Sequence, residues 1–316
     1  MPKNHRKQML AVFLRNPAVA FFCWNFWDKP LINYDMDELR KLFFDDVWEE
    51  ISKSAKSFPL SEIRIRVGKP IRYAANGKFV YVSKIASEKD VSRVLDVATG
   101  YSAYSASDAA LKGYLHYYGG VRIGITGEGV TDGGKLMNVK SVSSLCIRIP
   151  TDAEGVFEKL EGSVFFDGAV KNTAIVSPPF GGKTTMLRSM VRFASKTGAN
   201  VLVLDERYEL SGSGAFDLGE NTDVMLGAAK SVFFENVVRS MNPDVIAVDE
   251  IYAEREAEEL VKIANSGIKI FYTVHGDSLK RLEFSDAKKL FDVTEVGILL
   301  TKNPSPGTVK EVKRFA

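Results

Sequence analysis

Residues 177–185 read SPPFGGKTT; they complete the apolar run Thr173–Ser177 and precede MLRSMVRFAS, which has helical spacing. Glycines let backbone N–H groups turn toward an anion, while a helix N-terminus, a lysine and a hydroxyl add positive charge and a magnesium ligand. The stretch therefore predicts a strand, a phosphate-binding loop and a helix. The predicted phosphate-binding residues are Ser177, Pro178, Pro179, Phe180, Gly181, Gly182, Lys183, Thr184 and Thr185, with Thr184 also a predicted Mg²⁺ ligand.

One residue of this loop departs from the usual pattern. The pattern G-x-x-x-x-G-K-[ST] asks for glycine where this chain has Ser177. Serine is small enough for such a turn, so the substitution weakens the match without excluding it. Because the tetrapeptide Gly-Gly-Lys-Thr is common by chance, the prediction depends on the strand and the helix that flank it.

A second stretch, DVIAVDE at 244–250, predicts a short buried strand that ends in Asp249 and Glu250. An aspartate at the carboxyl end of such a strand can hold hydrated Mg²⁺, and the next carboxylate can orient and deprotonate the attacking water. The two stretches lie about 65 residues apart, with one strand and one helix predicted between them. That separation suits elements that face the same crevice of a parallel sheet. Asp249 is the predicted Mg²⁺ ligand and Glu250 the predicted catalytic base.

Composition is that of a soluble protein of about two domains, with 316 residues, 45% hydrophobic and 26% charged. The net charge of +2 argues against a dedicated nucleic-acid binder, which usually carries a large basic excess. The few cysteines and histidines have no metal-site or disulfide spacing, which favours a reducing compartment. These residues are Cys23, Cys146, His5, His116 and His275.

Residues 1–35 differ in character from the rest of the chain. They hold five of the 42 Lys and Arg but two of the 40 Asp and Glu, so the small positive excess resides there. Arg15 and Pro17 interrupt the apolar stretch, which predicts neither a signal peptide nor a membrane span. We expect Met36 to be the native start; a surface-associating segment is the alternative.

The remainder divides into a smaller α+β domain at 36–150, a linker at 151–168 and a doubly wound α/β domain at 169–316. A helix is predicted from Met36 through MDELRKLFFDDVWEEISKSAKSF. Strand alternation follows in SEIRIRVGKP, a turn at Asn76-Gly77, a capping box from Ser87 to Asp90, and a second helix at about 107–116. From residue 169 onward, strands alternate with helices.

Further stretches carry a family resemblance: LDERYEL at 204–210, TDVMLGAAK at 222–230 and FYTVHGDS at 271–278, with EIRIRVGKP, GGVRIGITG and SLCIRI before them. Their order resembles the stage III sporulation protein AA family, within the type II and type IV secretion ATPases, from about Met36 to the C-terminus. The resemblance implies a RecA-like P-loop ATPase domain behind a smaller N-terminal domain, with ATP and Mg²⁺ as cofactors. It also implies a homo-oligomeric ring, a hexamer, in the cytoplasm on the mother-cell face of a channel of membrane proteins.

The resemblance assigns roles to individual residues. Lys183 would hold the phosphates, and Glu250 would activate water. Asp205, Glu206, Arg207 and Glu209 match an acidic box, and His275, after the third strand beyond the loop, matches a histidine box that can report the γ-phosphate. Arginines partly supplied by the smaller domain across a subunit interface would stabilise the transition state. The implied catalytic residues are Glu250, Lys183, Glu206, Glu209, His275, Arg148, Arg122 and Arg239.

Two other functions stay open at this point. A nucleic-acid-dependent ATPase would use the same core, although the near-zero net charge and the lack of an aromatic-basic platform count against it. A non-catalytic nucleotide-binding assembly subunit is the second, because Ser177, Tyr208 and Tyr252 depart from the family pattern. The two tyrosines would add bulk near the expected crevice.

Overall fold

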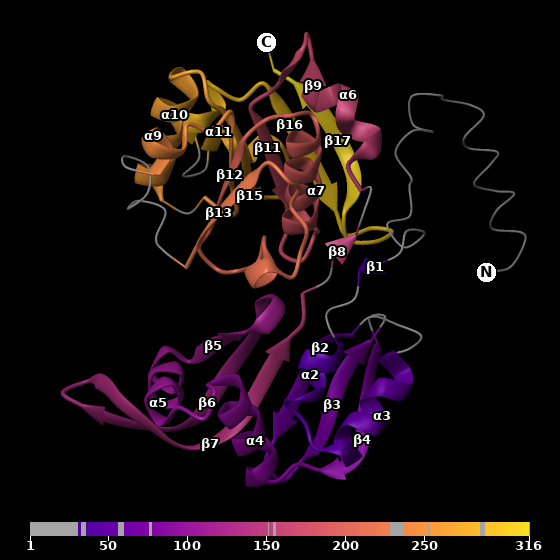
Figure 1. The fold of residues 1–316 in the computed structure, drawn as a ribbon, viewed down its shortest axis with the longest axis vertical. Coiled ribbons are helices and arrows are strands. Elements are labelled where there is room, and N and C mark those ends of the chain that lie inside the picture. Colours follow the sequence, from indigo (N-terminus) through magenta and orange to yellow (C-terminus); the bar gives the residue numbers. More distant parts are fainter. Residues whose placement is uncertain are drawn as a thin grey trace, which may run out of the picture. The chain divides into compact units, whose positions relative to one another are not determined.

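The computed structural model describes residues 31–32, 36–55, 60–75, 78–150, 152–153, 156–227, 237–251, 253–284 and 288–315. The extension at 1–30, the Asn76-Gly77 turn and Tyr252 lie outside the described residues. The chain forms two compact units (Figure 1). The six-stranded unit contains Leu31–Asp152 and Arg207–Asp217, and the seven-stranded unit contains Ala153–Glu206 and the chain from Leu218.

The sheet of the seven-stranded unit has the order β13-β12-β14-β15-β11-β16-β17. All neighbouring strands are parallel except β16 and β17, which are antiparallel. The strands are β11 Thr173–Ser177, β12 Val201–Asp205, β13 Thr222–Leu226, β14 Val245–Val248, β15 Lys269–His275, β16 Val296–Thr301 and β17 Thr308–Arg314. Every residue of β11, β12 and β14 is buried, as expected for parallel strands covered on both faces.

Helices cover both faces of this sheet. Helix α7 contacts β11, β12, β14 and β15, and α10 contacts β15 (Figure 1). Side chains of β11 such as Val176 share a buried cluster with Leu260 of α10. The helices are α6 Glu161–Val164, α7 Lys183–Lys196, α9 Val237–Met241, α10 Glu254–Asn265, α11 Arg281–Phe284 and α12 Lys288–Phe291, with short elements η3 Glu158–Leu160, β9 Phe165–Phe166 and β10 Ala169–Val170. None of the helices in the described ranges is long and apolar enough to cross a bilayer.

The connection between the phosphate-loop helix and β14 contains two strands, not the single strand that the sequence predicts. The additional strand is β13, which lies at the edge of the sheet and has mostly exposed side chains. Its apolar run is only Val224 to Leu226, shorter than the runs of about four to eight residues by which a buried strand is recognised. His275 therefore ends the fourth strand beyond the phosphate loop, and the prediction of the third was wrong.

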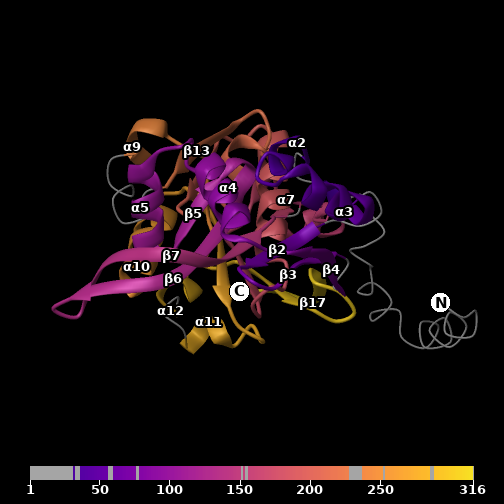
Figure 2. The same cartoon turned by 90° about the horizontal axis from the view of Figure 1, so that it is seen from below.

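The sheet of the six-stranded unit is antiparallel throughout, in the order β4-β3-β2-β7-β6-β5. Its elements are α2 Met36–Arg40, α3 Asp45–Ala55, β2 Leu60–Arg66, β3 Pro70–Ala75, β4 Lys78–Ile85, α4 Glu88–Ala98, α5 Ala103–Lys112, β5 Tyr114–Tyr117, η2 Tyr118–Gly120, β6 Val121–Asp132 and β7 Lys135–Arg148. Helices α2 to α5 cover one face (Figure 2), where Ile63 and Ile65 of β2 are fully buried. Beyond this sheet, β1 Leu31–Ile32 pairs with β8 Asp152–Ala153.

Two helix predictions in this unit were wrong in their bounds. The helix expected from Met36 through residue 58 is two helices, because the chain turns after α2 with Leu42 N–H donating to Leu39 O at 3.2 Å. The helix expected at 107–116 is α5, which ends at Gly113 with φ +76°, a left-handed conformation that glycine adopts without strain. The capping box is present, because the Ser87 N–H donates to Asp90 Oδ2 at 2.8 Å.

A loop between β12 and β13, Arg207–Asp217, belongs to the six-stranded unit, although both strands belong to the other. We call it the inserted loop. It contains η4, Gly212–Gly214, and its Tyr208 ring lies 4.7 Å from that of His116. A Cβ on Gly120 would lie 2.7 Å from the Tyr208 carbonyl oxygen, so the two backbones are in direct contact. The inserted loop is thus packed into the six-stranded unit.

Candidate active site

The register of the parallel strands brings the ends of four of them to one edge. Ser177 at the end of β11 pairs with His275 at the end of β15. Val248 of β14 pairs with Tyr272 of β15 and with Leu204 of β12. Each strand therefore ends at the carboxyl edge of the sheet, where ligands bind in open α/β folds.

The phosphate loop connects β11 to α7 across this edge. Ser177 is fully buried, and its hydroxyl donates to the Pro178 carbonyl oxygen at 2.8 Å. A Cβ on Gly181 would lie 1.8 Å from Ser177 Oγ, so the serine side chain occupies space that only glycine at 181 leaves open. Gly182 precedes α7 with φ +90°. Gly181 thus leaves room for the Ser177 side chain. Gly182 supplies the turn with positive φ at the helix N-terminus.

Lys183 and His275 form part of a chain of polar contacts. Lys183 is 6% exposed, with its Nζ 3.5 Å from Ser177 O and 3.4 Å from His275 Nδ1. The His275 Nε2 lies 3.1 Å from Glu250 Oε1. Since an ammonium group can only donate, Nδ1 must accept, which leaves the proton on Nε2 to be donated to Glu250. The imidazole thus connects the lysine to the predicted base.

Asp249 accepts hydrogen bonds from two hydroxyl groups. Thr184 Oγ1 donates to Asp249 Oδ2 at 2.8 Å, and Thr273 Oγ1 donates to Asp249 Oδ1 at 2.7 Å. A hydroxyl beside a carboxylate suits Mg²⁺, which is usually held by one or two protein oxygens together with phosphate oxygens and water. No cluster of three or more His, Cys, Asp or Glu able to cage a metal occurs among the residues that the structure describes. The donor set fits a magnesium ion that a nucleotide helps to hold.

Glu250 has an unusual backbone. Its φ is +51°, a left-handed conformation that costs a non-glycine residue about 1–3 kcal/mol. Its N–H donates to Thr273 Oγ1 at 2.9 Å, and the Ile251 N–H donates to the Thr273 carbonyl oxygen at 3.1 Å. These bonds to β15 hold the strained turn and direct the carboxylate toward His275.

Thr273 is a site residue that the sequence reasoning missed. It is fully buried, and its hydroxyl donates to Asp249 and accepts from the backbone of Glu250. The available signal was its position two residues before His275 on one strand, which places both side chains on one face. A threonine within a buried β-run usually suggests only β-propensity, so the signal was weak.

The acidic box is divided between the two units. Asp205 is buried at the end of β12, and Glu206 follows it, exposed, in the seven-stranded unit. Arg207 and Glu209 lie in the inserted loop of the six-stranded unit, as does Tyr208. The segment that the sequence suggested as one group therefore spans a unit boundary.

Two of the three predicted arginines, Arg122 and Arg148, belong to the six-stranded unit. Arg122 of β6 and Arg148 of β7 are register partners in the six-stranded unit, and the Arg122 guanidinium lies 4.2 Å from the Tyr114 ring centroid. Arg239 lies on α9, and its side chain is outside the described residues. Within the seven-stranded unit the structure brings together Lys183, Thr184, Asp249, Glu250 and His275.

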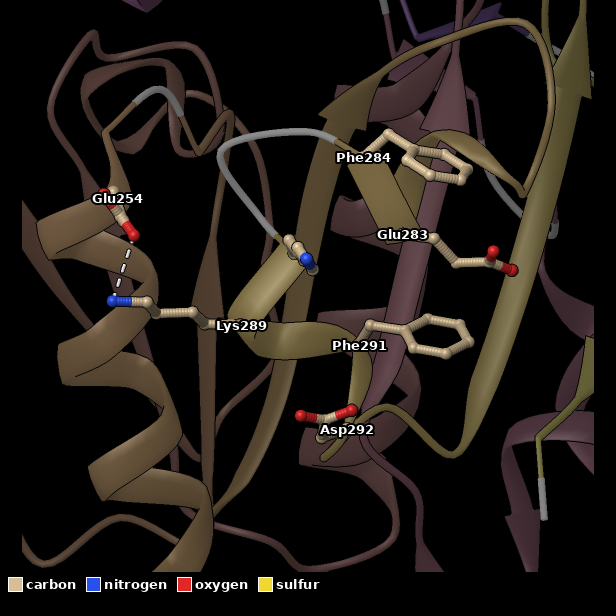
Figure 3. A pocket seen from close by; sticks show the side chains of 7 residues that line it. Glu254, Glu283, Phe284, Lys289, Phe291 and Asp292 are labelled. Atoms are coloured by element: carbon tan, nitrogen blue, oxygen red, sulfur yellow. Dashed lines mark ion pairs between the residues drawn. The ribbon is translucent and has the colours of Figure 1, made fainter.

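A hollow of about 520 Å³ lies elsewhere on the seven-stranded unit, beside α10, α11 and α12 (Figure 3). Lys289 Nζ lies 3.0 Å from Glu254 Oε1 on one side, while the rings of Phe284 and Phe291 point away from that pair, beside Glu283. Its lining residues are Glu254, Glu283, Phe284, Lys288, Lys289, Phe291 and Asp292, and none of them was a predicted site residue.

Comparisons with known proteins identify the family of the chain and relatives of its fold. Residues 37–314 match the family described as sporulation stage III, protein AA. Stage III sporulation protein AA of Bacillus subtilis (strain 168) is 29% identical over 265 residues, 80% of this chain and 86% of that protein. The Legionella pneumophila ATPase DotB has a TM-score of 0.57 at 17% identity, covering 81% of this chain and 76% of its own. The structure of the pilus retraction motor PilT with bound ADP has a TM-score of 0.54 at 17% sequence identity. The similarity covers 79% of this chain and 76% of the PilT chain.

The structural similarity confirms the predicted fold class, a RecA-like α/β domain with a smaller N-terminal domain. The sequence match confirms the predicted resemblance. This chain belongs to the stage III sporulation protein AA family.

Proposed function

We propose that this chain is a Mg²⁺-dependent ATPase that converts ATP and water to ADP and phosphate. The observation that carries the proposal is one set of contacts at the carboxyl edge of the parallel sheet. Thr184 at the start of α7 donates to Asp249 at 2.8 Å, and Lys183 and Glu250 both contact His275. A phosphate-binding helix, a magnesium ligand set and a candidate base thus meet at one place.

The residues would divide the work as follows. The N–H groups of the phosphate loop and Lys183 bind the β- and γ-phosphates, and Thr184 and Asp249 hold Mg²⁺. When bound, Mg²⁺ neutralises charge on the phosphate oxygens. Glu250 orients the attacking water and accepts its proton, and Thr273 positions both acidic residues. His275 lies between Lys183 and Glu250, so a change at the phosphate end can reach the base.

We also propose a setting, which family membership supports. The chain would act as a homo-oligomeric ring, a hexamer, in the cytoplasm of the mother cell. It would power or assemble a complex of sporulation membrane proteins rather than act on nucleic acid. Arginines such as Arg122 and Arg148 would be supplied to the site of a neighbouring subunit in that ring.

The test is phosphate release from ATP and Mg²⁺ by the purified chain, compared with Lys183→Ala. We expect the variant to lose activity by on the order of 100-fold or more, because a charge aimed at the transferred group is removed. Lys196→Ala, at the exposed far end of the same helix, is the matched control and should keep the parent rate. Equal activity of parent and Lys183→Ala would reject the site. Tight ATP binding by a parent that releases no phosphate would favour a non-catalytic assembly subunit.

A further inference from the structure

The phosphate loop carries an aromatic residue where glycine would fit more easily. Phe180 has φ +58°, a conformation that bulky residues rarely adopt, and it is 72% exposed. A ring that is mostly exposed contributes little to stability by burial, while its backbone is strained. Burial therefore does not account for phenylalanine at this position, whereas contact with a ligand would.

A turn from a distant part of the chain lies beside this loop. Residues 302–307 connect β16 to β17, and the Gly307 N–H donates to the Gly181 carbonyl oxygen at 2.8 Å. A Cβ on Gly182 would lie 2.9 Å from Gly307 Cα, so the two backbones are in contact. The Lys302 Nζ lies 5.7 Å from the Phe180 ring centroid. Residues 302–307 and the Phe180 ring together form one border of the phosphate loop.

The sheet order indicates which end of a nucleotide would reach this border. Strand β11 pairs with β15 on one side and with β16 on the other. Of the groups suited to the terminal phosphate, Asp249 and Glu250 directly follow β14, and His275 ends β15. A triphosphate that extends from them along the phosphate loop would leave on the β16 side. Its sugar and base would then lie near Phe180 and residues 302–307.

We propose that the base of the nucleotide stacks on the ring of Phe180, with residues 302–307 as the adjoining wall. This inference rests on the proposed function and adds how the same site would recognise its substrate. Stacking on an aromatic ring depends on the area of the base and hardly on its hydrogen-bonding groups. The site would therefore prefer purine to pyrimidine nucleotides and discriminate little between ATP and GTP.

The test compares ligands with and without a base, by calorimetry on the full chain with Mg²⁺. The variant is Phe180→Gly, which relieves the backbone strain and removes the ring, with Phe180→Trp as the variant that keeps stacking. The parent should bind ATP more tightly than inorganic tripolyphosphate. In Phe180→Gly, ATP affinity should fall by on the order of tenfold to a hundredfold, while tripolyphosphate affinity stays within about twofold. Phe180→Trp should retain the parent affinity for ATP.

The other outcomes are separable. ATP affinity unchanged in Phe180→Gly would overturn the proposal, as would an equal loss for ATP and tripolyphosphate, which would mean that Phe180 only shapes the phosphate loop. A parent that binds ATP but ranks ATP, GTP and CTP alike would also overturn it. A folded parent that binds neither ATP nor tripolyphosphate would refute the proposed function itself, and this inference with it.

Discussion

The two sheets of this molecule present polar groups in opposite ways. In the seven-stranded unit, β12 is buried at every residue, and its chemistry-bearing side chain, Asp205, comes at the strand end. In the six-stranded unit, β2 alternates, with Ile63 and Ile65 inward and Glu62 and Arg64 on the other face. A parallel sheet covered on both faces can offer polar groups only at its edges, whereas a half-covered antiparallel sheet offers them along its length. The candidate site residues of the seven-stranded unit are therefore gathered at one edge of its sheet, whereas the polar residues of the six-stranded unit are distributed along its strands.

The largest effect should come from the strained acid at the carboxyl edge. Glu250→Gln should keep ATP affinity and lower phosphate release by about 10²–10⁴-fold, because an amide cannot accept the proton of water. Single-turnover phosphate release and calorimetry measure the two quantities. Glu254→Gln, on α10 outside the site, is the control. A Glu250→Gln variant that hydrolyses at the parent rate would remove Glu250 as the base.

The next effect concerns the packing inside the phosphate loop. Gly181→Ala would place a methyl group 1.8 Å from Ser177 Oγ, so the loop must move. Because displacing a binding group by about 1 Å can cost 100-fold, we expect ATP affinity to fall by on the order of 100-fold. Adding Ser177→Gly should recover part of that loss, since the remaining close contact is with Pro178 O at 2.9 Å. Additive losses in the double-mutant cycle would show that the two positions are independent.

A smaller effect tests whether the six-stranded unit takes part in the chemistry at all. Arg122→Ala and Arg148→Ala should each lower turnover by on the order of tenfold with little change in ATP affinity, if a neighbouring subunit uses them. Arg64→Ala is the matched control, because its guanidinium is hydrogen-bonded to Glu62 at 2.5 Å on the same sheet. If both variants hydrolyse ATP at the parent rate, neither arginine takes part in catalysis, and the seven-stranded unit supplies the catalytic residues.

The smallest effect lies at the amino edge of the parallel sheet. Burial alone would raise the pKa of Glu295, but bonds from Lys269 and the Asn172 N–H, both 2.8 Å, outweigh it and lower that pKa below the ordinary 4.5. A carboxylate with a lowered folded pKa stabilises the protein above pH 4.5, and the contribution is lost as the pH falls through the folded value. Its partial exposure limits this contribution to about 1 kcal/mol.

Urea unfolding of Glu295→Gln against the parent measures this contribution. The difference in the free energy of unfolding should be full near pH 7 and should shrink below the ordinary pKa of 4.5. Glu311→Gln, at an exposed carboxylate on β17, is the matched control. A pH-independent difference would assign the effect of Glu295 to packing instead of charge.

The sequence predicted those parts of the structure whose pattern lies within one short stretch of the chain. Apolar runs predicted β11 and β14, and the order of motifs predicted the family and the fold class, both confirmed. The strand β13 was missed because its apolar run is short and its side chains are mostly exposed. The first helix was predicted too long because its turn lacks glycine and proline.

Parts of the candidate site were out of reach of the sequence for a different reason. Thr273 has its role only because β14 and β15 are neighbours, and the contact of Gly307 with Gly181 joins segments far apart in the chain. The roles of the predicted site residues stay predictions. What the structure adds is the proximity of five of them, Lys183, Thr184, Asp249, Glu250 and His275, at one edge of the parallel sheet.

The inserted loop has a practical consequence for anyone who dissects this protein. Neither unit is one continuous stretch of chain, because residues 207–217 leave the seven-stranded unit and return to it. A fragment that begins at residue 153 would carry this loop without Gly120 and His116, against which it packs. A fragment that stops at residue 152 would leave that surface uncovered. Expression of either half alone should therefore give a less soluble product than the whole chain, and shortening the loop to a tight turn is the sensible first repair.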